Sequence, residues 1–202
     1  MRRLICLAII LNTMLIGISC SPNAIKSTTA QTASKVPTPT TTTQQTPIPR
    51  QIAGFQVAEY THEVYACKVL YPSTWTRSTE ATNFISITFQ SPDSFSRIQL
   101  AIYPSVSSFS LEEYIEINAE ASKYYWDEYR EISRTSITSP EYDNGIIITT
   151  SYLFKGMSIK EKSLWLKKGG VIYSVNGISS ESEFDAYSQL FDGVLNSFSF
   201  KQ

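Results

Sequence analysis

The sequence of 202 residues is poor in the side chains on which most metal sites and catalytic dyads depend. It contains three cysteines and a single histidine, His62, which lies between Glu59 and Glu63. A zinc site normally combines several imidazole or thiolate ligands, and no second imidazole or thiolate pair exists to complete this trio. A solvated histidine near the start of a strand explains the trio better than a metal site. We therefore expect no metal site and no cofactor.

The motifs of common catalytic and nucleotide-binding sites are missing as well. There is no Gly-x-Ser-x-Gly elbow, and a Ser-His-Asp triad would have to use His62. Gly169-Gly170 belongs to no phosphate-binding loop, and no acidic run has calcium-loop spacing. We predict no catalytic residue. Paired carboxylates of the kind that hydrolyse glycosides remain the alternative, because sequence spacing does not place two acidic groups in space.

Net charge excludes another class of function. The whole chain carries a formal charge of −1, without the basic excess of a dedicated nucleic-acid binder. All 18 acidic residues lie after residue 50, where only 12 basic residues accompany them, so this part has a charge of −6. It should repel acidic polymers and anionic lipid headgroups. We expect no nucleic-acid partner.

Residues 1–19 have the layout of a bacterial lipoprotein signal peptide. Arg2 and Arg3 precede an apolar run, Leu4–Ile18, whose 15 residues would reach about 22 Å as a helix, short of a bilayer core of about 30 Å. This favours an exported signal peptide over a membrane span. The run ends in Ile16-Gly17-Ile18-Ser19-Cys20, which resembles a lipobox. We predict a lipid on Cys20; the alternative is an ordinary signal peptide with a chance cysteine.

Residues 20–50 are interpreted as a stalk. Nine threonines and five prolines lie between residues 21 and 50, with almost no large apolar side chain. Such a composition buries too little surface to offset chain entropy. The sequence thus predicts a lipidated Cys20, a disordered stalk to residue 50 and a folded domain at 51–202. Cys67 would then be the single thiol of the domain, and its apolar neighbours favour an inert core residue over a reactive one.

Alternating and helical hydrophobic patterns divide the domain into strands and two helices. The expected strands are 64–71, 84–90, 97–103, 130–136, 146–154, 158–166 and 171–176, with a short edge strand at 199–200. Ser110 with Glu113 forms a capping box before a helix at 111–126, and Ser180 with Glu183 forms a second one before the last helix. Asp143-Asn144-Gly145 is read as a hairpin turn, and the two turns that follow are expected at Lys155-Gly156-Met157 and Lys167-Lys168-Gly169-Gly170. We predict an α+β fold, an antiparallel sheet of about six to seven strands flanked by helices.

Three short motifs give the chain a family resemblance. Tyr71-Pro72-Ser73-Thr74-Trp75 follows a strand, and Val171-Ile172-Tyr173-Ser174-Val175 leads towards a helix that ends in Phe191-Asp192-Gly193-Val194-Leu195-Asn196-Ser197-Phe198. In the order of elements, residues 55–200 resemble the PsbP family and its bacterial PsbP-like relatives. The resemblance implies an antiparallel sheet sandwiched by helices, an α/β/α arrangement. Family members in oxygenic phototrophs are lumenal extrinsic proteins that assist photosystem II, and cyanobacterial members are similar in being lipoproteins.

These features together predict a lipid-anchored, non-catalytic binding or assembly module on the outer side of a membrane. Its expected partners are the membrane, through the lipid, and a protein that the sequence does not identify. The alternative is an envelope hydrolase that acts through paired carboxylates, which would need a cleft holding two carboxylates about 5 to 9.5 Å apart.

Replacing Cys20 with serine tests the anchor. We expect Cys20→Ser to release the protein from membranes and to abolish its labelling with radioactive fatty acid, because the acceptor sulfur is gone. Membrane fractionation of wild type and variant measures both effects. Unchanged membrane retention of the variant would refute the lipid anchor.

Overall fold

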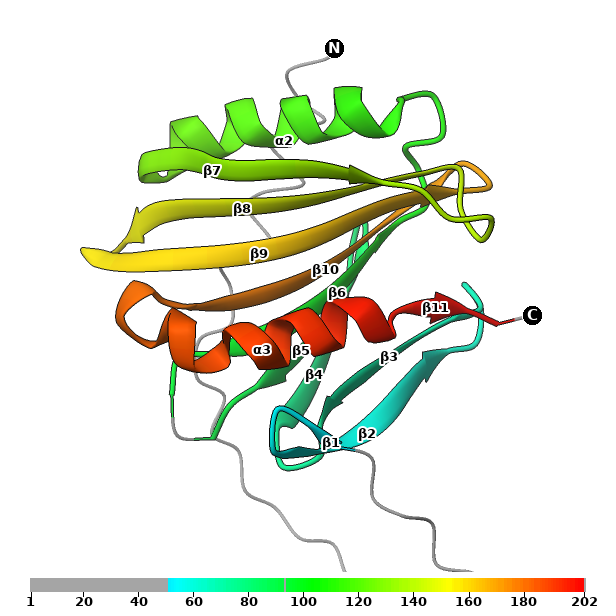
Figure 1. Ribbon diagram of the computed structural model, residues 1–202. Helices are drawn as coiled ribbons and strands as arrows, with labels where there is room; N and C mark the ends of the chain where they lie inside the picture. The colour runs from blue at the N-terminus through cyan, green and yellow to red at the C-terminus, as the bar shows by residue number, and fades with distance from the viewer. Residues whose placement is uncertain (1–50, 93, 202) are drawn as a thin grey trace, which may run out of the picture.

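The computed structural model describes residues 51–92 and 94–201, which form two antiparallel sheets and two helices (Figure 1). The predicted signal peptide, the lipidated Cys20 and the stalk lie outside the described residues. The strands are β1 (Gln51–Ile52), β2 (Phe55–His62), β3 (Cys67–Pro72), β4 (Thr76–Ala81), β5 (Ile85–Gln90), β6 (Arg97–Tyr103), β7 (Asp127–Ile137), β8 (Asn144–Phe154), β9 (Met157–Lys168), β10 (Val171–Ser180) and β11 (Ser199–Phe200). The helices are α2 (Leu111–Tyr125) and α3 (Glu181–Ser197). None of the described helices has the length and apolar character needed to cross a membrane.

The larger sheet has seven strands in the order β4-β5-β6-β10-β9-β8-β7, and every pairing is antiparallel. It confirms the predicted antiparallel sheet flanked by helices. The strand predicted at 64–71 lies outside this sheet, because β3 pairs with β2 and β11 in a separate sheet of order β1-β2-β3-β11. That strand also begins later than predicted, since Val64 is 81% exposed in the turn before Cys67.

Strand β10 joins the two halves of the large sheet. It pairs with β6 on one side and with β9 on the other, and eight of its ten residues are buried. Alternation sends its side chains to two different cores. Ile172 joins the core under α2, whereas Tyr173 and Val175 join the core under α3.

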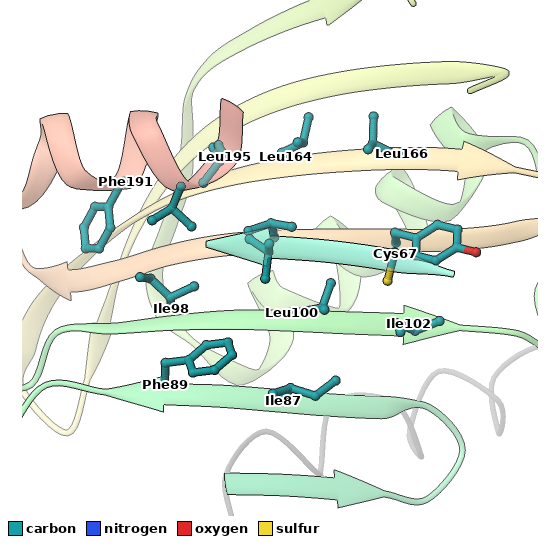
Figure 2. Packing of buried hydrophobic residues seen from close by; sticks show 14 of the residues in the cluster. Cys67, Ile87, Phe89, Ile98, Leu100, Ile102, Leu164, Leu166, Phe191 and Leu195 are labelled. Atoms are coloured by element: carbon teal, nitrogen blue, oxygen red, sulfur yellow. The ribbon is translucent and has the colours of Figure 1, made fainter. Parts of the chain in front are cut away.

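The sheet is the middle layer of three. Helix α2 covers one face through Leu111, Tyr114 and Ile115. The other face is covered by α3 together with the small sheet, which run side by side in Figure 1. Figure 2 shows this second core, in which Phe191 and Leu195 of α3 pack towards the sheet. The sequence patterns predicted that a helix alone would cover this face. The structure shows that α3 shares it with the small sheet.

The two helix starts differ from each other. Ser110 Oγ accepts from the Glu113 N–H at 3.1 Å, and the Ser110 N–H donates to Glu113 Oε2 at 2.9 Å, so the first capping box is confirmed. Ser180 is the N-cap of α3, but its hydroxyl donates to Glu183 Oε2 at 3.1 Å and caps no backbone N–H. The prediction of a second capping box was therefore wrong, because the Ser180 and Glu183 side chains bond to each other and not to the backbone.

The hairpin turn predicted at Asp143-Asn144-Gly145 joins β7 to β8 but lies earlier in the chain. β8 begins at Asn144, and neither Asn144 nor Gly145 has its backbone in the left-handed region, so the prediction was wrong for these two residues. Gly145 serves packing instead: a Cβ there would meet Ile137 Cγ1 at 2.6 Å and Tyr142 Cε2 at 2.8 Å. The tight turns predicted after β8 and β9 are confirmed, and in the first of them Lys155 and Gly156 both have positive φ.

A close approach between β10 and α3 fixes how the helix sits on the sheet. A Cβ at Gly177 would lie 2.3 Å from Phe191 Cγ, although the φ angle of Gly177 permits any residue. We expect Gly177→Ala to lower the free energy of unfolding by about 1–3 kcal/mol, because the added methyl overpacks the core. Urea denaturation followed by circular dichroism measures this loss.

The double variant Gly177→Ala with Phe191→Leu is the control. Since leucine removes the ring that the new methyl meets, the two losses should be less than additive. Additive losses would show that this contact does not set the position of α3.

Candidate ligand cavity beneath helix α2

A cavity of about 340 Å³ lies between the C-terminal half of α2 and the large sheet, and we call it the α2 cavity. Its volume is within the range of small-molecule sites, and aromatic and hydrogen-bonding side chains line it together. The aromatic lining residues are Phe95, Tyr103, Trp126, Tyr129, Tyr152, Phe154 and Trp165. The polar and charged ones are Arg97, Gln99, Asn118, Ser122, Glu131, Thr150, Lys155, Glu161, Ser163 and Asn176.

The side chains of β9 alternate between the two faces of the sheet, which explains how a strand with several charged residues can line a cavity. Glu161 and Ser163 point to the α2 face, whereas their neighbours Lys160 and Lys162 point to the α3 face. There the Lys160 ammonium lies 4.7 Å from the centroid of the Phe184 ring, and Lys162 forms an ion pair with Asp192. The Lys-Glu-Lys sequence therefore divides its charges between two layers.

Glu161 is the less exposed of the two acidic groups that line the cavity. Its Oε1 accepts from the Ser163 hydroxyl at 2.7 Å, and its Oε2 accepts from the Tyr152 hydroxyl at 3.3 Å. Burial raises the pKa of Glu161 above its ordinary value; the Ser163 hydrogen bond, the charge of Arg97 and the Tyr152 hydrogen bond oppose this rise. The result is a carboxylate with two bound donors and room for others.

Asn176 gives the cavity an acceptor without a partner. The residue is 5% exposed, and its amide nitrogen donates to Ser174 Oγ at 3.3 Å and to Gln99 Oε1 at 3.4 Å. Its Oδ1 is buried and has no hydrogen-bond partner. Leaving such a group unsatisfied costs about 1–3 kcal/mol, so a donor supplied from the cavity would stabilise it.

One wall of the cavity is a cluster of aromatic rings. The Trp126 ring lies 5.0 Å from that of Tyr152 and 5.5 Å from that of Phe154, between ring centroids. Tyr129 continues the cluster, with its ring 6.5 Å from that of Tyr152. Burial, and then the charges of Glu161 and other carboxylates, raise the pKa of Tyr129 to about 12, so its hydroxyl keeps its proton.

The cavity contains two carboxylates, but they are not equivalent. Both oxygens of Glu131 accept from Arg134, Oε1 from Nε at 2.9 Å and Oε2 from Nη2 at 2.7 Å. Glu161 is bound by two neutral hydroxyls instead. A hydrolase of the alternative kind needs one carboxyl to donate a proton and the other to act as base or nucleophile. The Arg134 guanidinium occupies both oxygens of Glu131, so this arrangement does not favour that chemistry.

His62, Glu59 and Glu63 each have a separate partner in the structure. His62 is the last residue of β2, half-buried, and its Nδ1 accepts weakly from the Tyr65 N–H at 3.4 Å. Glu59 forms an ion pair with Lys68 at 3.6 Å, and Glu63 with Lys201 at 2.7 Å. Within residues 51–92 and 94–201 no three potential ligands gather around a metal position.

Cys67 is buried as predicted, with no exposed surface, and it lies in the core on the α3 face. Burial raises the pKa of its thiol to about 12, which keeps it protonated. No residue of the α2 cavity was identified from the sequence. The one available signal was the pair Glu161 and Ser163, polar residues two apart that stand between the apolar Ile159 and Trp165 on one face of β9.

Comparison with known proteins places the fold. Neither the protein-family models nor the curated proteins gave a match. The solution structure of cyanobacterial PsbP (CyanoP) from Synechocystis is similar with a TM-score of 0.59 and 13% identity, over 71% of this chain and 92% of that one. LpqN, involved in cell envelope biogenesis of Mycobacterium tuberculosis, has a TM-score of 0.50 and 10% identity, over 73% and 91%. The described residues thus have the PsbP-like fold, as the resemblance implied.

The raised pKa of Glu161 predicts a pH dependence of stability. The native state holds this proton more tightly than the unfolded chain, so the contribution of Glu161 is fully present below pH 4.5 and is lost as pH rises through the higher native pKa. We expect Glu161→Gln to remove that decline. Free energies of unfolding from urea titrations between pH 4 and 8 measure it.

The exposed Glu141→Gln is the matched control for charge removal. The free energy of unfolding of Glu161→Gln should exceed that of wild type by an amount that grows with pH. The difference between Glu141→Gln and wild type should not grow in this way. A pH-independent difference for Glu161→Gln would contradict the assignment of a desolvated carboxyl.

Proposed function

We propose that this PsbP-like chain is a lipid-anchored, non-catalytic binding module outside the cytoplasm, and that it binds its ligand in the α2 cavity. The single observation that carries the proposal is Asn176 Oδ1, a buried acceptor without a partner on the wall of a cavity of ligand size. Buried polar groups in native proteins are nearly always paired, so an exception calls for a partner from outside the chain.

The location rests on the sequence before residue 51. The positive start, the short apolar run and the lipobox-like Ile16-Gly17-Ile18-Ser19-Cys20 are those of an exported lipoprotein. A similar fold in LpqN, a protein of cell envelope biogenesis, agrees with that location. The likeness to cyanobacterial PsbP, at 13% identity, supports the fold and carries no photosynthetic role.

The proposal includes a protein partner beside the membrane. In the described part of the chain β4 is an outer strand of the large sheet, and five of its six residues are exposed. An outer strand offers backbone N–H and C=O groups to which a strand of another protein can be added. The charge of −6 over residues 51–202 disfavours nucleic acid as that partner.

Blocking the cavity from α2 tests the binding function. Ser122 lines the cavity and is half-buried, so we expect Ser122→Phe to fill the space without disturbing the core. Wild-type full chain incubated with a low-molecular-weight extract of the host envelope should retain a small-molecule adduct in native mass spectrometry. Ser122→Phe should lose it.

Lys123→Phe is the control, because it adds the same side chain at the next, exposed position of α2, which does not line the cavity. It should retain the adduct. Equal adducts on Ser122→Phe and Lys123→Phe, or none on wild type, would count against the proposal. Chemically altered extract components after incubation would favour the hydrolase.

A further inference from the structure

We propose that the ligand of the α2 cavity is a neutral saccharide, whose hydroxyls reach Asn176 and Glu161 while its apolar ring face lies against Trp126. This inference rests on the proposed function and specifies its ligand class. It is supported by three properties of the cavity: the acceptors on its floor, the shape of its aromatic wall and the balance of its charges.

The acceptors on the floor require a ligand that donates several hydrogen bonds. Asn176 Oδ1 needs one donor, because its own amide nitrogen is already turned towards Ser174 and Gln99. The Glu161 carboxylate offers about four acceptor positions, of which Ser163 and Tyr152 occupy two. Adjacent hydroxyls on one sugar ring supply donors of this kind from a single molecule.

The aromatic wall suits the face of a sugar ring. Trp126, Tyr152 and Phe154 pack against one another, with angles between ring planes of 32° for Trp126–Tyr152 and 68° for Trp126–Phe154. Rings in mutual contact form a surface and leave no slot between parallel planes, which a flat heterocycle would need. The electron-rich face of an indole attracts the weakly positive C–H groups that a pyranose presents on one side.

The charges of the lining favour a neutral ligand. Arg97 and Lys155 supply two positive charges, and Glu131 and Glu161 supply two negative ones. The cations already lie over rings, Arg97 at 5.0 Å from the Phe95 centroid and Lys155 at 5.3 Å from that of Phe154. An anion would meet the carboxylates and a cationic ligand would meet Arg97 and Lys155. A lipid tail would leave the polar floor desolvated without partners.

Titration calorimetry with defined sugars tests the inference. The full chain, kept in an amine-oxide detergent that has no sugar headgroup, is titrated with glucose, N-acetylglucosamine, maltose and trehalose. Glucuronate, glucosamine and adenosine are the anionic, cationic and heterocyclic comparisons. We expect binding of at least one neutral sugar, accompanied by a change in tryptophan emission.

Three variants locate the binding. Asn176→Leu, Glu161→Gln and Trp126→Ala should each weaken the Kd of that sugar about tenfold, the effect of losing one well-placed contact. Lys123→Phe should leave it unchanged. Because Asn176→Leu removes the partner of Gln99, Glu161→Gln provides a second acceptor variant of almost unchanged shape, and circular dichroism verifies that each variant is folded.

The outcomes separate the two proposals. If adenosine or a charged sugar binds in the cavity and no neutral sugar does, the saccharide inference is overturned and the binding function stands. If no probe binds and the envelope extract leaves no adduct on wild type, both are overturned. Binding of a neutral sugar that all three variants retain at full affinity also overturns the inference, because it places the sugar elsewhere.

Discussion

The pairing of β10 with β6 is the constraint on which the rest of the structure depends. It brings Ile172 opposite Tyr103 and Ile178 opposite Arg97, which are 69 and 81 residues apart in the chain, and so joins two meanders into one sheet. Because β10 is central, each of its side chains must fit a covered layer on one face or the other. Asn176 therefore faces the α2 cavity while the next residue, Gly177, meets Phe191 of α3.

The cavity is a consequence of how α2 distributes its side chains. The N-terminal half of the helix buries Leu111, Tyr114 and Ile115 against the sheet, so this half lies close to it. Further along, the sheet-facing positions are Asn118, Ala119 and Ser122, whose side chains fill less space. A helix of this composition is fixed at one end and stands over a space at the other, and polar strand residues occupy the floor of that space.

Local patterns predicted those elements whose signals are local. The Ser110 capping box and the turn at Lys155-Gly156 depend on neighbours in sequence, and both were found. Strand β4 was missed because its residues are exposed on both sides and show no alternation, and Asn144-Gly145 misled because Gly145 is needed for close packing. Glu161 escaped notice because lysines flank it, and because residues of five other elements, β6, α2, β7, β8 and β10, line the cavity with it. A site built from residues of several strands leaves no periodic pattern in the sequence.

The small sheet determines where a force on the chain before residue 51 would enter the domain. Gln51 and Ile52 pair with Gln56 and Phe55, and Ile52 fits closely over Gly193 of α3. Any pull on the chain that precedes residue 51 is borne first by this two-residue strand. The load passes into α3 and the small sheet, on the opposite face of the large sheet from the α2 cavity. Tension on the proposed tether would therefore load β1 before the floor of the α2 cavity, because the two lie on opposite faces of the large sheet.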